Sequence, residues 1–213
     1  MPTPRPDGLC FDPDAARVHL EAADPALAAV IRRAGRITLR PEPTQSLFAA
    51  LLRSIVYQQL SGKAAATIHR RVLALFAPKR HPSAADLLAV SDDQLRAAGL
   101  SRNKTAAVRD LARRTLDGTV PRLAHVHRLD DEAVIERLTA VRGVGRWTAE
   151  MILMFRLGRA DVLPLGDLGV RKGFQRTYGM RRLPSPVTIE RRAERWRPYR
   201  SAASWYLWRA AEF

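Results

Sequence analysis

This chain of 213 residues contains one cysteine, Cys10, and that scarcity excludes two kinds of site. A single thiol cannot build an internal disulfide framework, nor can it supply a four-cysteine zinc or iron–sulfur centre. The five histidines are dispersed, and only His125 and His127 lie close together. Because no cysteine or carboxylate stands near them at ligand spacing, we interpret this pair as a solvated loop rather than a metal site.

Long apolar runs are also missing. No segment approaches the roughly 20 apolar residues that a membrane helix requires, and the first ten residues, MPTPRPDGLC, lack the apolar core of a signal peptide. We therefore expect a cytosolic protein with no membrane partner. A hydrophobic content of 46% and a charged content of 27% are ordinary for a soluble globular protein.

Acidic residues are scarce relative to basic ones. The chain has 36 Lys and Arg against 21 Asp and Glu, a net charge of +15. From Arg171 to Phe213 there are eleven basic residues and only three acidic ones. This excess predicts a basic face that binds nucleic-acid phosphates. The alternative is a solvated arginine-rich surface, since 32 of the 36 basic residues are arginine.

Apolar residues recur at helical spacing along almost the whole chain, and alternating strand patterns are absent. We therefore expect an all-α fold of about ten short helices. Ser83 and Ser91 are predicted N-caps, and Thr38–Pro43 is predicted to be an extended connector. The predicted helices cover Pro25–Ala34, Gln45–Gln59, Lys63–Phe76, Ala84–Val90, a short segment ending at Gly99, Lys104–Leu116, Asp131–Val141, Trp147–Leu157, Asp167–Tyr178, Thr188–Arg195 and a segment after Pro198.

The most informative stretch is Leu138–Asp167, LTAVRGVGRWTAEMILMFRLGRADVLPLGD. Gly143 and Gly145 flank Val144, and glycine tolerates the backbone conformations of a tight hairpin between two helices. The hairpin N–H groups would lie at the N-terminus of the helix that begins near Arg146, where anions bind readily. A plain turn packed in a core would use the same residues.

One carboxylate follows this hairpin at the start of another predicted helix. Asp167 comes after Pro164 and Gly166 and precedes an amphipathic run. Aspartate is a common N-cap, so a purely structural role is one interpretation. The hairpin upstream favours a second interpretation, in which this carboxylate does chemistry.

Two linked motifs resemble the HhH-GPD superfamily of DNA glycosylases. GVGRWTA, within Leu138–Met151, resembles its helix-hairpin-helix, and ADVLPLGDLGVRKGF (Ala160–Phe174) resembles its Gly/Pro-rich loop with the catalytic aspartate. The similarity extends over Ser46–Trp208 and is greatest to the AlkA-type 3-methyladenine DNA glycosylase II branch. It includes SIVYQQLSGKAAATIHRRV (Ser54–Val72) and ERWRPYRSAASWYLW (Glu194–Trp208).

The resemblance implies a single glycosylase unit over residues 1–213, with two helical lobes flanking a DNA-binding and active-site cleft. One lobe would cover about residues 44–159 and contain the helix-hairpin-helix at 131–157. The other would combine residues 1–43 with 160–213. AlkA carries an additional N-terminal β-domain, and we expect none here because only about 45 residues precede the first family helix. Some branches hold an iron–sulfur cluster, which the single cysteine excludes.

The resemblance assigns the catalytic role to Asp167. Cleavage of an N-glycosidic bond builds positive charge on the deoxyribose, which a carboxylate can stabilise while it orients the attacking water. Asp161 is interpreted as a structural partner. Family members that also cut the DNA backbone use a lysine at the position of Trp147, so the resemblance implies a monofunctional enzyme without lyase activity.

A base pocket is implied at Trp147, Met151 and Trp208. Trp147 and Trp208 match aromatic positions of the AlkA pocket, and an indole face attracts the positive charge of an alkylated purine. AlkA has an aromatic residue where this chain has Met151, so we expect a softer or differently shaped wall. Trp196 is expected in the core, and for Trp205 core packing and a site role remain open.

Contacts to DNA are implied at two turns. Gln59, with Leu60 as the second choice, is expected to fill the gap left by an extruded base, although an ordinary helix terminus would look the same. The hairpin residues expected to hold phosphates are Gly143, Val144, Gly145 and Arg146. Family members also bind a monovalent cation, such as sodium or potassium, on main-chain carbonyls, which here match Thr139, Val141 and Val144.

The leading hypothesis is a monofunctional DNA N-glycosylase that excises alkylated purines of the 3-methyladenine and 7-methylguanine type. It would act as a monomer on damaged double-stranded DNA, initiate base-excision repair and need no cofactor for catalysis. One alternative is a non-catalytic helix-hairpin-helix DNA-binding protein. Another is a glycosylase for a different damaged base, although the tryptophan at position 147 and the missing cysteine cluster oppose the oxidised-purine and mismatch branches.

Overall fold

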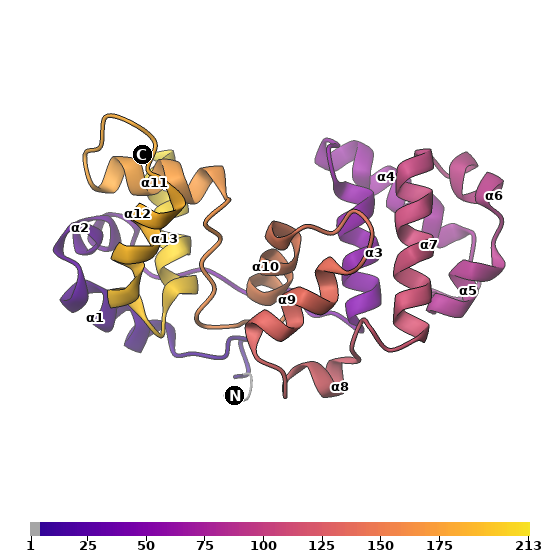
Figure 1. Cartoon of the computed structure of the whole chain (residues 1–213), viewed down its shortest axis with the longest axis horizontal. Coiled ribbons are helices and arrows are strands. Elements are labelled where there is room, and N and C mark those ends of the chain that lie inside the picture. Colours follow the sequence, from indigo (N-terminus) through magenta and orange to yellow (C-terminus); the bar gives the residue numbers. More distant parts are fainter. Residues whose placement is uncertain (1–4) are drawn as a thin grey trace. The chain divides into compact units, whose positions relative to one another are not determined.

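The computed structural model describes residues 5–213, which form two compact units. Unit 1 is the continuous stretch Thr44–Ala149, and unit 2 combines the described residues through Pro43 with Glu150–Phe213. All regular elements among these described residues are helices, so the expected all-α fold is confirmed (Figure 1). Within the same residues, none of the helices is both long and apolar enough to span a membrane.

Seven helices lie wholly in unit 1, and most begin at a serine or aspartate whose side chain caps the first turn. Ser83 and Ser91 are N-caps as predicted, and each takes part in a reciprocal capping box. The helices are α3 (Leu47–Tyr57), α4 (Gly62–Ala74), α5 (Ala84–Ala89), α6 (Asp92–Ala97), α7 (Arg102–Leu116), α8 (Leu123–Val126) and α9 (Asp131–Thr139).

Unit 2 contains five α-helices and one 3-10 turn, and the chain enters it within the helix α10 (Arg146–Phe155). Its elements are α1 (Pro13–Ala23), α2 (Pro25–Ala34), α11 (Leu168–Thr177), α12 (Pro186–Ala193), the 3-10 turn Glu194–Trp196 and α13 (Arg200–Glu212). The sequence predicted neither α1 nor α8. In α1 alanines supply much of the apolar face, with Ala16 and Leu20 buried, and α8 has four residues and no side-chain cap.

The division between the units falls after Ala149, whereas the sequence placed a lobe boundary near residue 159. The C-terminal half of α10 makes its contacts in unit 2. The Phe155 ring stacks on that of Trp208 with ring centres 5.6 Å apart, and the Phe155 carbonyl accepts a hydrogen bond from the Glu42 N–H. These contacts assign the end of α10 to unit 2.

The core of unit 2 is built around the packing of α11 on α13. A Cβ placed on Gly173 would lie 1.8 Å from the Leu207 carbonyl oxygen, so only glycine permits this approach of the two backbones. Trp196 is fully buried, as the sequence predicted, and Trp205 is buried as well. Both therefore serve the packing of unit 2.

Asp24 is a buried carboxylate that joins the beginning of unit 2 to its end. Its side chain caps α2 and accepts hydrogen bonds from Arg192 Nε at 2.9 Å, the Tyr178 hydroxyl at 2.6 Å and Trp196 Nε1 at 3.2 Å. Burial alone would raise the pKa of Asp24, but the hydrogen bonds from Arg192, Tyr178 and Trp196 outweigh it and lower the pKa to about 2. The carboxylate is thus held ionised inside unit 2.

Candidate DNA-binding and catalytic site

The helix-hairpin-helix consists of α9, a turn and α10, as the sequence predicted. Gly143 has φ +77°, a conformation that favours glycine, whereas Gly145 does not adopt a positive φ. Val144 between them is buried, and its N–H donates to the Val141 carbonyl at 3.0 Å. Only Gly143 therefore uses the conformational freedom for which both glycines were singled out.

The charge of Arg146, expected to face DNA phosphates, already has a partner in unit 1. The guanidinium donates to both carboxylate oxygens of Glu132, in the first turn of α9, at 2.9 and 2.5 Å. Both side chains are exposed, so solvent screens the pair. A phosphate bound at this hairpin would share Arg146 with Glu132.

The expected wedge residues lie on the turn between α3 and α4. Gln59 has φ +57° and is the one non-glycine residue with a positive φ in the described part of the chain. Such a backbone persists where the surrounding structure holds it, and it is concentrated at functional sites. The side chains of Gln59 and Leu60 are both exposed, which a wedge requires.

This wedge turn, Gln58–Leu60, is tied directly to the hairpin. The side-chain Nε2 of Gln58 donates to the carbonyl oxygen of Gly143 at 3.0 Å. The structure therefore brings the expected wedge and the expected phosphate-binding hairpin together within unit 1. Sequence reasoning marked the turn but did not assign this bridging role to Gln58.

Asp167 is the N-cap of α11, and two hydrogen bonds fix its carboxylate. The Val170 N–H and the Trp208 indole Nε1–H each donate to Oδ1 at 2.8 Å. The first is an ordinary cap within α11, and the second comes from α13. Asp167 and Trp208, two of the expected site residues, are thus neighbours in unit 2.

Gly169 makes this pairing possible, and sequence reasoning missed it. A Cβ at position 169 would lie 2.8 Å from Trp208 Cδ1 and 3.1 Å from Asp167 Oδ1. A glycine in the first turn of a helix costs up to about 1 kcal/mol relative to alanine. A glycine at this cost, two residues after a candidate catalytic aspartate, could have indicated from the sequence that position 169 cannot hold a side chain.

The remaining pocket residues belong to different units. Trp147 lies in unit 1 and is 49% exposed, whereas Met151 and Trp208 are half-buried in unit 2. Phe155, which stacks on Trp208, is an aromatic residue that sequence reasoning missed. The positions 147, 151 and 155 share a four-residue spacing in α10, which places residues along one helix face and could have indicated it.

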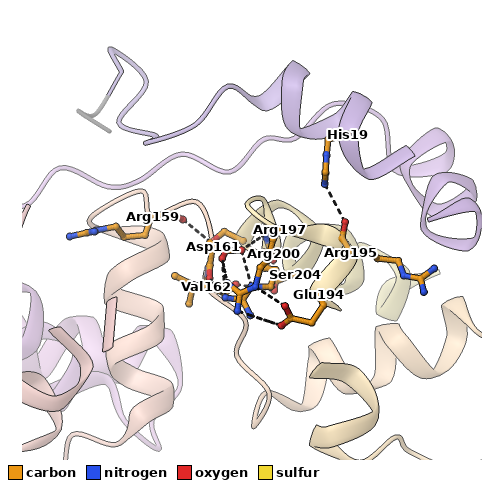
Figure 2. Close-up of polar contacts among 10 residues, drawn as sticks. His19, Arg159, Asp161, Val162, Glu194, Arg195, Arg197, Arg200 and Ser204 are labelled. Atoms are coloured by element: carbon orange, nitrogen blue, oxygen red, sulfur yellow. Dashed lines mark hydrogen bonds and ion pairs between the residues drawn. The ribbon is translucent and has the colours of Figure 1, made fainter. Parts of the chain in front are cut away.

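Asp161 has the structural role expected of it. Figure 2 shows its carboxylate between Arg197 and Arg200, with Glu194 beside them. Arg200 donates to both carboxylate oxygens, from Nε at 2.8 Å and from Nη2 at 2.9 Å, and Arg197 donates at 2.5 Å. These ion pairs anchor the loop before Asp167 to the start of α13.

The chain is similar to known proteins in sequence and in fold. Residues 52–198 match the HhH-GPD superfamily of base excision DNA repair proteins, which is well over half of the chain. The chain belongs to the HhH-GPD superfamily. The DNA-3-methyladenine glycosylase 1 of Schizosaccharomyces pombe is 31% identical over 202 residues, which cover 92% of this chain and 87% of that protein.

Two solved structures agree with the superfamily fold. A DNA-3-methyladenine glycosidase from Bacillus halodurans aligns with a TM-score of 0.85 and 37% identity over 94% of this chain and 91% of that one. The S. pombe 3-methyladenine DNA glycosylase Mag1, in complex with abasic DNA, aligns with a TM-score of 0.79 and 31% identity, covering 93% and 97%. The chain is therefore an AlkA/Mag1-like member of the superfamily, as its sequence motifs predicted.

Proposed function

We propose that this HhH-GPD protein is a monofunctional DNA N-glycosylase that excises alkylated purines and so initiates base-excision repair. The observation that carries the proposal is the fixed carboxylate of Asp167, capped onto α11 and held by the Trp208 indole. Its relatives in yeast and bacteria are named as DNA-3-methyladenine glycosylases. A protein that only grips DNA needs no carboxylate fixed in this way.

The role proposed for Asp167 is electrostatic stabilisation of the transition state. As the bond between base and sugar lengthens, positive charge develops on the deoxyribose, and a preorganised carboxylate stabilises that charge without reorganising. The same oxygen atoms can orient the attacking water and take its proton. The two hydrogen bonds to Oδ1 keep the carboxylate in one orientation for both tasks.

Base recognition is assigned to aromatic surfaces. Trp147 and Trp208 present indole faces that attract a cationic alkylated purine, and the Phe155 ring supports Trp208 by stacking. Met151 contributes a flexible and polarisable wall in place of a third flat ring. Aromatic surfaces of this kind accept several alkylated bases, because charge and stacking require no fixed hydrogen-bond pattern.

Damaged double-stranded DNA is the proposed partner. Gln59 and Leu60 would enter the stack as the base leaves it, while the hairpin residues Gly143, Val144, Gly145 and Arg146 hold a phosphate. The carbonyls of Thr139, Val141 and Val144 would hold the monovalent cation. The Thr139 carbonyl suits it because Thr139 ends α9, where carbonyls lack intrahelical donors. Val141 and Val144 lie in the turn that follows, and the Val141 carbonyl also accepts the Val144 N–H.

We expect no lyase activity, because a Schiff base with the sugar needs an amine and position 147 holds tryptophan. Borohydride reduction during the reaction with damaged DNA should therefore trap no covalent protein–DNA adduct. A known bifunctional glycosylase, treated in parallel, supplies the positive control. An adduct formed by this protein would show that one of its amines acts as a nucleophile.

The proposed function is tested by incubating the protein with duplex DNA treated with a methylating agent and analysing the bases released. Release of 3-methyladenine or 7-methylguanine by the wild type is the expected result. Binding without release of any methylated base would favour a DNA-binding module or a glycosylase for another lesion.

Gly169→Ala should lower the excision rate about tenfold without destabilising the protein. The added Cβ displaces the Trp208 indole from Asp167 Oδ1, while alanine favours the helix by up to about 1 kcal/mol. Single-turnover excision and thermal unfolding measure the two effects separately. Gly166→Ala is the matched control, since a Cβ there would meet no atom within 4 Å. Equal excision rates for both variants would show that the contact between Trp208 and Asp167 does not determine the rate.

A further inference from the structure

Three residues of α7 contact the wedge turn and the hairpin of unit 1. Lys104, Ala107 and Asp110 follow one another at intervals of three residues, so they share one face of the helix. The first contacts the wedge turn, and the other two contact the hairpin. No DNA-binding role had been expected of any of them.

Lys104 contacts the wedge turn through its ammonium group. Nζ donates to the carbonyl oxygens of Val56 at 2.7 Å and Gln58 at 2.8 Å, at the C-terminal end of α3. These carbonyls lack helical donors and lie at the negative end of the helix dipole. Burial lowers the pKa of the Lys104 ammonium, which shows that this charge is partly withdrawn from water.

Ala107 and Asp110 contact the hairpin. A Cβ placed on Gly143 would lie 3.6 Å from the Cβ of Ala107, so the turn rests directly on α7. Asp110 Oδ2 accepts the Arg142 N–H at 2.8 Å and Arg114 Nε at 3.1 Å. The hairpin is thus fixed by a carboxylate from the same helix that carries Lys104.

We propose that α7 is a brace that sets the wedge turn at a fixed position relative to the hairpin, and that Lys104 is its key positioning residue. The Gln58–Gly143 hydrogen bond also joins the wedge turn directly to the hairpin. Because Gln59 holds a left-handed backbone, its turn needs external support to persist. The inference rests on the proposed function, since a wedge and a phosphate grip must engage one duplex at matching places.

A direct phosphate contact is the competing role for Lys104. The two roles differ in their salt dependence. A lysine that neutralises a phosphate adds about one to the slope of log affinity against log salt. A lysine that directs two of its three N–H donors at the Val56 and Gln58 carbonyls and makes no phosphate contact leaves this slope unchanged and acts on the preference for a lesion over intact duplex.

Lys104→Met keeps the length of the side chain and removes its donors. Amide hydrogen exchange of residues 57–61 in the DNA-free protein should become about tenfold faster, with no change in unit 2. The preference for abasic-site duplex over intact duplex should fall about tenfold at an unchanged salt slope. Lys104→Arg keeps the charge and the donors, so it should restore most of the slow exchange at residues 57–61 and most of the lesion preference. Lys63→Met, at an exposed lysine of α4, should change neither the exchange nor the lesion preference.

The outcomes separate the brace from the proposed function. Unchanged exchange at residues 57–61 in Lys104→Met would overturn the brace, as would a loss of about one in the salt slope with lesion preference intact. If Lys104→Met unfolds, Lys104→Arg decides. A folded Lys104→Arg protein with wild-type exchange and lesion preference supports the brace, and a folded one that loses both overturns it. If Lys104→Met exchanges faster but the wild type shows no preference for a lesion, the brace is retained and the glycosylase function is not supported.

Discussion

Asp167→Asn is expected to lower single-turnover excision of methylated purines by about a thousandfold. Asparagine is as good an N-cap as aspartate, and its side-chain oxygen can accept from Val170 and Trp208 in the place of Oδ1. The variant can therefore keep both of these hydrogen bonds while it loses the negative charge. Its free energy of unfolding should stay within about 1 kcal/mol of the wild type, and its affinity for abasic-site DNA should be retained.

Asp161→Asn is the matched control for this experiment, because Asp161 lies six residues earlier in the same loop. Its carboxylate is paired with Arg197 and Arg200, so its loss should affect stability more than chemistry. A variant Asp167→Asn with normal excision would refute the catalytic assignment. Excision that is lost in a folded Asp161→Asn protein but kept in Asp167→Asn would move the assignment to Asp161.

Asp24→Ala is expected to lower the free energy of unfolding of unit 2 by about 3 kcal/mol. The substitution leaves the Arg192 guanidinium, the Tyr178 hydroxyl and the Trp196 indole N–H without their shared acceptor, and it removes the cap of α2. The Arg192 side chain keeps about a third of its surface exposed, which places the effect at the lower end of the range for buried pairs. Urea denaturation measures the loss.

Asp12→Ala is the control, because Asp12 also caps a helix that begins with proline but its carboxylate is exposed. Loss of a cap alone should cost about 1 kcal/mol. Equal losses for Asp12→Ala and Asp24→Ala would mean that the buried network adds nothing beyond the cap.

The same carboxylate gives a pH dependence. The pKa of Asp24 falls from 3.8 to about 2 on folding, so its contribution is fully present above pH ~4 and is lost as the pH falls towards ~2. Over that interval the network should lose about 2 kcal/mol of stability. In Asp24→Ala this part of the acid sensitivity should be absent, and urea midpoints measured from pH 5 to pH 2 would show whether it is.

The fold and the helix-hairpin-helix motif could be predicted from local sequence features. The Gly-Val-Gly turn, the serine caps and the aspartate after Pro164 and Gly166 each act over a few residues, so their patterns can be read from the chain. The all-α fold and the superfamily were predicted from them and confirmed. Helix α1 was missed because Ala16 and Leu20 are its only buried residues, and alanine gives little hydrophobic contrast.

The contacts that hold the candidate site in place could not be predicted from the sequence. Phe155 and Trp208 are 53 positions apart, and Lys104 meets Val56 across 48. Such pairs depend on how helices pack, and no spacing rule connects them. Gly169 and Gln58 were inside the quoted motifs, yet their partners, Trp208 and Gly143, come from other elements.

The discontinuous make-up of unit 2 has a consequence for synthesis on the ribosome. Asp24 emerges early, but its partners Tyr178, Arg192 and Trp196 are added only after the whole of unit 1. The continuous stretch Thr44–Ala149 has all its own contacts available first, so the order of translation lets it fold while the N-terminal helices wait. Throughout that interval α1 and α2 expose the apolar faces that α13 later covers, and exposed apolar surface of this kind favours aggregation until α13 is made.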